Sequence, residues 1–339
     1  MIRVLKNKSF MTGFLFVFLT LMGSLMYGWF FDNYIPVAEL RFTEDGVKSP
    51  PYSPWEYPPF GTNNLAQSMF HILLIGAKYT LGVALLIAGL RFMLSFVWGT
   101  ISELYAPKLN QWSRPFLEAF YYYPVTLIAY LMLYWVLFAD GQFNGVDSEF
   151  TYGFGARVII EVIVLTLAAV PITSLTISKE VNQILRKEFM ESVRILGGNR
   201  RHVLMKHILP FLKPQLVIIF LREMIQVLIL LAHLGILGIF FGGGAMKEDL
   251  FRNVVYVSLS NEWSGIIGNN FRFLFTTYWW IAISPIFLLT LTVLAFKLML
   301  EGYQNMQSAP PKKSPIAEPK EEGPVKEEER FDRVKRSIG

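Results

Sequence analysis

The chain has 339 residues, of which 53% are hydrophobic and 17% are charged, and its formal net charge is +5. Its mean hydropathy of +0.41 is too high, and its charge content too low, for an ordinary soluble domain, so the composition predicts an integral membrane protein. The absence of cysteine excludes disulfides, thiol catalysis and cysteine metal sites, and none of the four histidines stands at ligand spacing from acidic residues.

The first predicted element is an apolar run of about 22 residues from Phe10 to Phe31, which is long enough to cross the hydrocarbon core of a bilayer. Basic residues precede this run and no small-residue cleavage site follows it. We therefore expect residues 1–31 to form a retained N-terminal transmembrane helix that starts in the cytoplasm. Residues 32–70 are polar and rich in proline, which predicts an irregular external loop.

Residues 71–302 are predicted to form the core of the protein, with five further spans. We expect these spans near 73–101, 116–138, 158–177, 211–241 and 280–300. Six spans place both chain ends in the cytoplasm, in agreement with the distribution of Lys and Arg. The predicted fold class is therefore an all-α integral membrane protein with six transmembrane helices.

Charge and composition then assign the remaining segments. The basic residues cluster in predicted cytoplasmic segments, so we interpret the positive net charge as a signal of membrane topology and not of nucleic-acid binding. Residues 303–339 are rich in Pro, Lys and Glu and cannot bury enough apolar surface to become ordered. We expect them to form a disordered cytoplasmic tail without a dedicated partner.

The most informative segment is the predicted cytoplasmic loop at 179–210. About eight Lys and Arg lie between Lys179 and Lys213, the largest basic excess in the chain. Apolar residues at helical spacing predict one amphipathic helix from Val181 to Leu196, which Gly197 and Gly198 then end. A second helical turn is expected before Pro210, which fits an early position of the next span.

The same segment resembles the EAA loop of ATP-binding-cassette importer permeases. Glu191 and Ser192, with Val193, stand for the Glu-Ala-Ala of that motif, and Gly197 stands for its glycine. The later positions are also in register, since His207 replaces an isoleucine and Leu209-Pro210 closes the motif. The sequence around the motif, which begins at Glu188 and includes Gly198, is closer to that of the oligopeptide and dipeptide permease branch. In that family the loop forms coupling helices that dock into a groove of a separate ATPase.

Two blocks near the second span extend the resemblance. Residues 58–63, PPFGTN, and residues 76–81, GAKYTL, resemble two blocks of the C-type subunit of peptide and nickel importers. Residues 65–68, LAQS, stand where that family has a Gly-Arg-Asp triplet. The blocks occur in the family's order over residues 60–302.

This resemblance implies a six-helix type I importer fold and transport by alternating access. The implied partners are two ABC ATPase subunits or domains, a second homologous permease, and an external or periplasmic substrate-binding protein. The chain itself would bind no cofactor, and ATP would be used by the partner subunits. The implied cargo is a dipeptide or oligopeptide, and the implied location is the bacterial plasma membrane, where the chain is multi-pass.

Motif searches agree with a transport subunit that is not an enzyme. The chain has no P-loop and no recognisable hydrolase or metalloprotease motif. Two other classes stay open. A degenerate permease could act as a membrane scaffold or sensor, which the replaced triplet would fit. An ion-gradient-driven secondary transporter would function without any ATPase.

Four ionisable residues fall inside predicted spans, where each costs about 3 kcal/mol near mid-bilayer unless it is paired or hydrated. They are Arg91 in the second span, Glu161 in the fourth, and Arg222 with Glu223 in the fifth. One hypothesis is that they line or gate a translocation path. The alternative is that they form interhelical ion pairs, for example Arg91 with Glu161, which only hold the bundle together.

Overall fold

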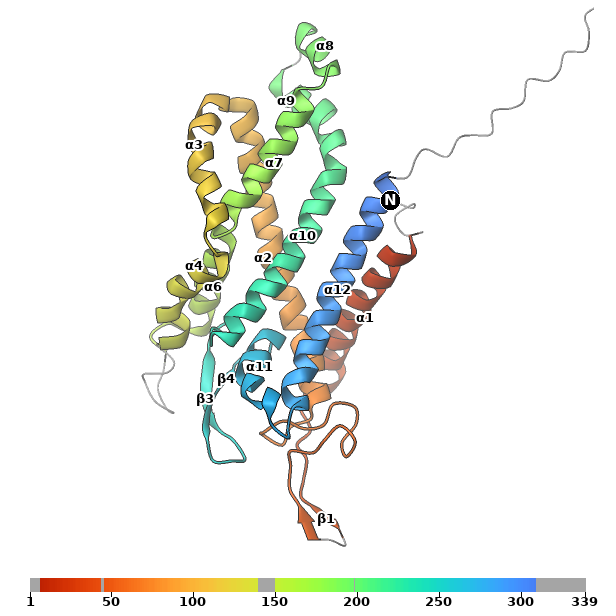
Figure 1. The fold of residues 1–339 in the computed structure, drawn as a ribbon, viewed down its shortest axis with the longest axis vertical. Coiled ribbons are helices and arrows are strands. Elements are labelled where there is room, and N and C mark those ends of the chain that lie inside the picture. Colours follow the sequence, from red (N-terminus) through yellow and green to blue (C-terminus); the bar gives the residue numbers. More distant parts are fainter. Residues whose placement is uncertain (1–6, 44–45, 140–149, 198, 309–339) are drawn as a thin grey trace, which may run out of the picture. The chain divides into compact units, whose positions relative to one another are not determined.

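Long apolar helices make up most of the computed structural model, which describes residues 7–43, 46–139, 150–197 and 199–308 (Figure 1). Within these ranges, four helices are long and apolar enough to cross a membrane, and six spans result if each of two bent helix pairs counts as one. The long helices are α1 Lys8–Phe31, α2 Met69–Tyr105, α10 Leu209–Ile236 and α12 Trp280–Ser308. Their positions agree with the predicted first, second, fifth and sixth spans.

Helix α1 packs against both α2 and α12. Asn7 caps its first turn, because the Asn7 side chain accepts the N–H of Phe10 at 3.1 Å. A Cβ atom on Gly13 would lie 2.2 Å from the Ala295 carbonyl oxygen, so only glycine permits this approach to α12. Near the end of α12, Gly302 lies similarly close to the backbone of Phe10. The start of α1 and the end of α12 therefore lie at the same end of the helix bundle.

The predicted third and fourth spans are each broken, although the sequence analysis treated them as continuous. The third, predicted near 116–138, begins earlier than expected, with α3 Pro107–Ala119. It continues through the 3₁₀ turn η2 Phe120–Tyr122, α4 Val125–Leu133 and the π-helical η3 Tyr134–Ala139. Its two halves meet at 83°. Pro124 causes this break, since its ring restricts Tyr123 to an extended backbone and removes a helical N–H.

The fourth span bends by 40° between α6 Phe154–Leu167 and α7 Val170–Leu185. Pro171 occupies the first turn of α7, where its missing N–H is tolerated. Short helical segments follow α7, namely α8 Phe189–Ile195, α9 Arg200–His202 and the π-helical η4 Val203–Ile208, which leads directly into α10.

Two short β-hairpins show that the fold is mostly helical but not all-α. Strand β1 Arg41–Thr43 pairs antiparallel with β2 Gly46–Lys48, and β3 Gly244–Glu248 pairs antiparallel with β4 Val254–Ser258. The chain then forms α11 Trp263–Asn270 and the 3₁₀ segment η5 Phe271–Phe275 before α12. In Figure 1 both hairpins lie at the opposite end of the helices from α8.

Apolar packing divides into two clusters. The larger surrounds α2, α10, α11 and α12 and includes Trp263, which is fully buried and donates its indole N–H to the Leu73 carbonyl at 2.7 Å. The smaller joins α7, α8, η4 and α10. It carries the segment that sequence analysis singled out.

The end of α12 differs from the predicted start of the C-terminal tail. Helix α12 continues to Ser308, so residues 303–308 are helical although the sequence analysis placed them in the disordered tail. The rest of that predicted tail, residues 309–339, lies outside the described residues.

Candidate functional site

The loop at 179–210 has the expected order of helix, glycine break and helix, but with two differences, one in each helix. The amphipathic helix is interrupted at residues 186–188, between α7 and α8. Gly197 has a φ of +72°, which ends α8 and favours glycine, while Gly198 lies outside the described residues. The predicted second helical turn is not separate, because residues 200–236 are continuously helical through η4.

The wide π turn of η4 ends at Ile208, two residues before Pro210. A proline ring would clash with the carbonyl four residues earlier in a regular α-helix, and it has no N–H to donate there. Lys206, four residues before Pro210, lies within η4, so the α-helical hydrogen-bond ladder is already altered where Pro210 cannot donate. Leu209 and His207 are half-buried in this region and Pro210 is exposed. The His207 ring centroid lies 5.7 Å from that of His202.

Helix α8 is held to the spans by apolar contacts. Met190 is only 1% exposed and belongs to the smaller cluster, with Val181, Val203 and Ile208. The ring of Phe189 packs against that of Phe211 in α10, with 5.2 Å between centroids. These contacts give α8 a fixed attachment to both α7 and α10.

The opposite side of α8 is open to solvent. Glu188, Glu191 and Ser192 are exposed there, and so is Gly197. Ile195 and Leu196 are 86% and 85% exposed, which the sequence did not predict. Leu196 was expected on the buried face of one long helix, but the helix ends one residue earlier and the chain turns away. Two adjacent apolar residues directly before a glycine pair were the available signal.

A cleft of ≈ 660 Å³ lies beside α8, and Glu191 and Arg200 contribute to its lining. The cleft also includes Glu103, which connects three helices. The Glu103 carboxylate accepts hydrogen bonds from Asn110 at 2.5 Å, from Ser178 at 2.8 Å, and from Asn182. This arrangement joins the ends of α2, α3 and α7, so the cleft wall and the base of the loop are structurally linked.

Two of the four ionisable residues in the spans form a buried ion pair. Arg91 NH1 and Glu223 Oε2 are 3.7 Å apart, and both side chains are at most 5% exposed. Arg91 also donates to the Leu165 carbonyl from Nε and NH2, at 2.8 Å and 2.5 Å. Thr173 donates to the other Glu223 oxygen at 2.5 Å. The pair thus fastens α2 to α10 at the bend of the fourth span.

The suggested ion pair between Arg91 and Glu161 is therefore wrong, because Arg91 pairs with Glu223. Glu161 is buried in α6 and accepts the backbone N–H of Gly242 at 2.9 Å. Next to it, Glu262 accepts the N–H of Phe241 at 3.0 Å and the hydroxyl groups of Ser258 and Ser260. Burial raises the pKa of Glu262, and these hydrogen bonds oppose that rise. Glu161 consequently holds the segment after α10 and does not meet Arg91.

Arg222 behaves differently from its neighbour Glu223. It is exposed in the middle of α10, and no ion pair or hydrogen bond reaches its guanidinium within the described ranges. Gln226 and Ile229 are also exposed, four and seven residues further along, so they share one side of the helix with Arg222. Sequence analysis named this residue but could not separate its direction from that of Glu223.

A cavity of ≈ 420 Å³ lies where the third and fourth spans are broken. Its polar lining comes from Arg91, Tyr121, Tyr123, Thr126, Thr173, Gln226 and His233. Apolar residues of α7 and α10 complete it. Among the residues that the structure describes, no three His, Asp or Glu side chains are grouped to hold a metal ion. The arrangement is suited to passage or binding of a solute.

Comparison with known proteins is consistent with this arrangement. Residues 94–305 match the sequence profile of the binding-protein-dependent transport system inner membrane component. The dipeptide transport system permease protein DppC of Bacillus subtilis is 22% identical over 312 residues, which cover 89% of this chain and 82% of that protein. A provisionally named peptide transport system permease protein of Brucella abortus is 20% identical over 307 residues, with 90% and 88% covered.

Proposed function

Since the chain belongs to the family of binding-protein-dependent transport system inner membrane components, we propose that it is one of two permease subunits of an ATP-binding-cassette importer for short peptides. Membership makes it a multi-pass inner-membrane transport component and not a catalytic subunit. A separate ATPase then supplies the energy, and a binding protein delivers the substrate. The peptide cargo is inferred from the Bacillus subtilis and Brucella abortus relatives, whose names specify dipeptide and peptide transport.

The exposed apolar tip of α8 is the observation that carries the proposal. Ile195, the last residue of α8, and Leu196, which follows it, are almost fully exposed, and Met190 anchors this helix to the spans. Adjacent exposed apolar residues on an anchored element are typical of a protein-protein contact. We assign this tip, with Glu188 and Glu191 beside it, as the ATPase-docking surface. Movement of the ATPases would then be transmitted through Met190 to α7 and α10.

The exposed charge of Arg222 supports a translocation path on one side of α10. A charge in the middle of an apolar span is costly in lipid, by about 3 kcal/mol on insertion scales. Arg222 would be stable if it faced a hydrated path between this chain and a second, homologous permease. Gln226 and His233 extend the polar surface toward the cavity at the broken spans. In this arrangement Arg91 lines the cavity, and its ion pair with Glu223 fixes that wall of the path.

The orientation follows from charge. The loop between α7 and α10 carries the largest excess of Lys and Arg, so the end with α8 is assigned to the cytoplasm. The start of α1 lies beside Gly302 near the end of α12, so these two helix ends would be on the same side of the membrane. Both hairpins would then be at the outer surface of the bacterial plasma membrane.

The test is reconstitution with matched variants of the tip. Ile195→Asp combined with Leu196→Asp should lower ATP-dependent peptide uptake by roughly 10-fold or more, since each removes an apolar contact of the kind that dominates interfaces. Ile195→Leu combined with Leu196→Ile keeps the apolar surface and should retain uptake. Co-purification of the ATPase subunits with each variant reports assembly separately from transport.

Other outcomes would select the competing functions. Uptake by this chain alone, driven by an ion gradient in liposomes without ATPase, would establish a secondary transporter. If tagged wild-type chain purifies folded but never with an ATPase, and no substrate moves, the chain is a scaffold or sensor. Retained ATP-dependent uptake in the double Asp variant would overturn the assignment of the α8 tip.

A further inference from the structure

The hairpin β1–β2 has two different faces. Phe42 is directly opposite Val47 in the antiparallel register, so these side chains share one face. Arg41 is opposite Lys48, and alternation along the strands places this pair on the other face. Phe42 is 83% exposed and Val47 is 59% exposed, so one face of the hairpin is apolar and uncovered.

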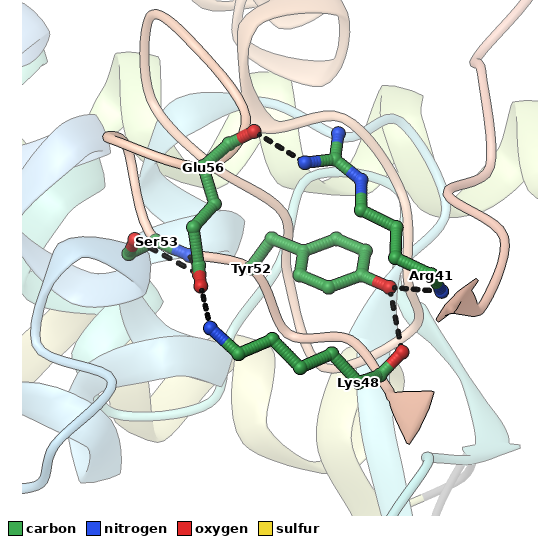
Figure 2. A network of polar contacts seen from close by, with 5 residues as sticks. All are labelled: Arg41, Lys48, Tyr52, Ser53 and Glu56. Atoms are coloured by element: carbon green, nitrogen blue, oxygen red, sulfur yellow. Dashed lines mark hydrogen bonds and ion pairs between the residues drawn. The ribbon is translucent and has the colours of Figure 1, made fainter. Parts of the chain in front are cut away.

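The other face is held by the polar network in Figure 2. Arg41 donates to the Glu56 carbonyl and Lys48 donates to the Glu56 carboxylate, both at 2.8 Å. The Tyr52 hydroxyl accepts the N–H of Arg41 at 3.1 Å and lies 2.9 Å from the Lys48 carbonyl. An isolated two-stranded hairpin is at best marginally stable in water, so these contacts fix its position.

The network continues to the membrane helices. Tyr52 is only 2% exposed, and its backbone N–H donates to the Thr62 hydroxyl at 2.7 Å. The Thr62 carbonyl in turn accepts the indole N–H of Trp280, at the start of α12, at 3.2 Å. The hairpin is therefore attached to a span through buried hydrogen bonds, and a partner that binds it would be held at a defined place over the bundle.

An apolar groove of ≈ 640 Å³ adjoins the uncovered face. Phe42 lines it, together with Val37, Leu40, Leu65 and Leu250, and Glu39 and Ser49 contribute polar atoms. Leu250 comes from the β3–β4 connection, and its N–H donates to the Asn64 carbonyl at 3.0 Å. The surface thus combines an exposed aromatic residue, an apolar hollow and a polar margin, as in the anchor regions of protein interfaces.

We propose that Phe42, Val47 and this groove, together called the hairpin surface, form a docking site for the substrate-binding protein, which inserts an apolar side chain into the groove. The proposal rests on the proposed function, because it needs the hairpin at the outer surface. The family description specifies dependence on a binding protein, and the proposed orientation puts this hairpin on the outer side, where such a protein would arrive. Figure 1 shows the hairpin extending beyond the ends of α1 and α2, away from the spans. In the proposed orientation this places it within reach of a soluble protein outside the membrane. Preorganisation by the Tyr52 network lowers the conformational cost of docking.

The test uses the assembled transporter in nanodiscs with its own binding protein. Phe42→Ser combined with Val47→Ser should weaken binding of that protein by roughly 10-fold or more. It should also remove the stimulation of ATP hydrolysis that the binding protein causes, while ATP hydrolysis without the binding protein stays at the wild-type rate. Phe42→Tyr combined with Val47→Ile, which keeps the strands and the apolar surface, should retain binding.

A photo-crosslinking residue at Phe42 keeps the proposal testable if the Ser variant folds poorly. We expect it to capture the binding protein, whereas the same residue at Trp112 in α3, which is 87% exposed at the other end of the bundle, should not. Capture of lipid or of a second copy of this chain at position 42 would overturn the docking proposal. Unchanged binding in a folded Ser variant would also overturn it, although ATP-driven uptake would still support the importer. If the wild-type assembly shows no ATP-driven uptake, that result would instead overturn the proposed function.

Discussion

The two proposed docking surfaces are built by opposite means. At one end, α8 exposes Ile195 and Leu196 and is held to the spans by apolar packing around Met190. At the other, the β1–β2 hairpin exposes Phe42 and Val47 and is held by hydrogen bonds and an ion pair around Tyr52 and Glu56. Apolar packing transmits displacement because close-packed side chains do not yield easily. The Lys48–Glu56 ion pair of the hairpin is partly exposed, and such contacts open more readily and depend on pH and salt.

This difference suits the two roles that we propose. The α8 tip must pass movement from the ATPase to α7 and α10, and a rigid apolar attachment serves that purpose. The hairpin surface must receive and release a soluble protein in every cycle, for which a fixed position is sufficient. The comparison therefore predicts that damage to the α8 attachment has a larger effect than damage to the hairpin attachment.

The largest effect is expected from Met190→Ala. Truncation of a fully buried methionine costs about 2–5 kcal/mol, because it leaves a cavity in the cluster that holds α8. We expect the ATPase subunits to bind this variant less tightly than the wild type, and ATP hydrolysis to become uncoupled from uptake. Hydrogen exchange in residues 186–197, measured beside coupling in proteoliposomes, should show faster opening of α8.

Met205→Ala is the matched control, because Met205 is 55% exposed in η4 and the same truncation leaves no buried cavity. It should change neither coupling nor exchange appreciably. Equal loss of coupling in the two variants would show that the buried attachment of α8 is not what transmits movement.

Sequence reasoning located the α8 attachment better than its exposed side. The apolar spacing correctly placed Val181 and Phe189 toward the spans, since a 3.6-residue period reports which face is buried. It failed for Leu196 because α8 stops at Ile195, one residue before the predicted end, and apolar spacing does not fix a helix end to one residue. The role of the tip in coupling stays a prediction.

Sequence reasoning also could not predict which charged residues pair within the membrane. Hydropathy found the spans because soluble domains rarely contain an apolar run long enough to cross a bilayer. It could not give the rotation of each helix about its axis, so it could not tell that Glu223 faces Arg91 whereas Arg222 faces outward. The 83° break at Pro124 was also missed, because a proline permits a bend but packing sets its angle.

The hairpin was not predicted at all. Its strands have three residues each, too few for a period of two to be recognised, and the surrounding prolines favoured an irregular loop. Its stability depends on Tyr52 and Glu56, which follow it in the chain and are not part of either strand. Contacts of this kind arise only when the loop folds back on itself.

An intermediate effect is expected from Tyr52→Phe. This change removes one hydroxyl and leaves the Arg41 N–H and the Lys48 and Glu39 carbonyls without that partner, at a cost of about 1–3 kcal/mol for buried polar groups. The hairpin should lose protection from hydrogen exchange, and the binding protein should dissociate faster.

Coupling of ATP hydrolysis to uptake at saturating binding protein should be almost unchanged in this variant, in contrast to Met190→Ala. A loss of coupling as large as that of Met190→Ala would erase the distinction between the two ends. Tyr57→Phe provides a control for loss of a tyrosine hydroxyl in the same loop, since it keeps the Tyr57 ring, whose centroid lies 6.0 Å from the Arg41 guanidinium carbon.

The smallest effect concerns pH and Glu56. The hydrogen bond from Lys48, followed by those from Ser53, lowers the pKa of Glu56 from 4.5 to about 2. A carboxyl group with a depressed pKa stabilises the folded state at pH values above its unfolded pKa, and this contribution is lost as the pH falls through the folded pKa. Stabilisation of the hairpin by Glu56 should therefore be complete above about pH 4.5 and should disappear as the pH falls toward about 2.

Hydrogen exchange of residues 41–57, corrected for the intrinsic effect of pH on exchange, would measure this loss. Because Glu56 is partly exposed, the change should be modest, about 1 kcal/mol or less. Glu56→Gln should remove the pH dependence in this window. Asp249 is the main competing group, because hydrogen bonds from Asn253, Asn64 and Phe251 outweigh its burial and lower its pKa as well. If the hairpin of Glu56→Gln still opened between these pH values, Asp249 beside the groove, and not the Lys48–Glu56 pair, would control the acid sensitivity of the hairpin surface. Over the same range α8, which is attached by apolar contacts, should show no change in protection.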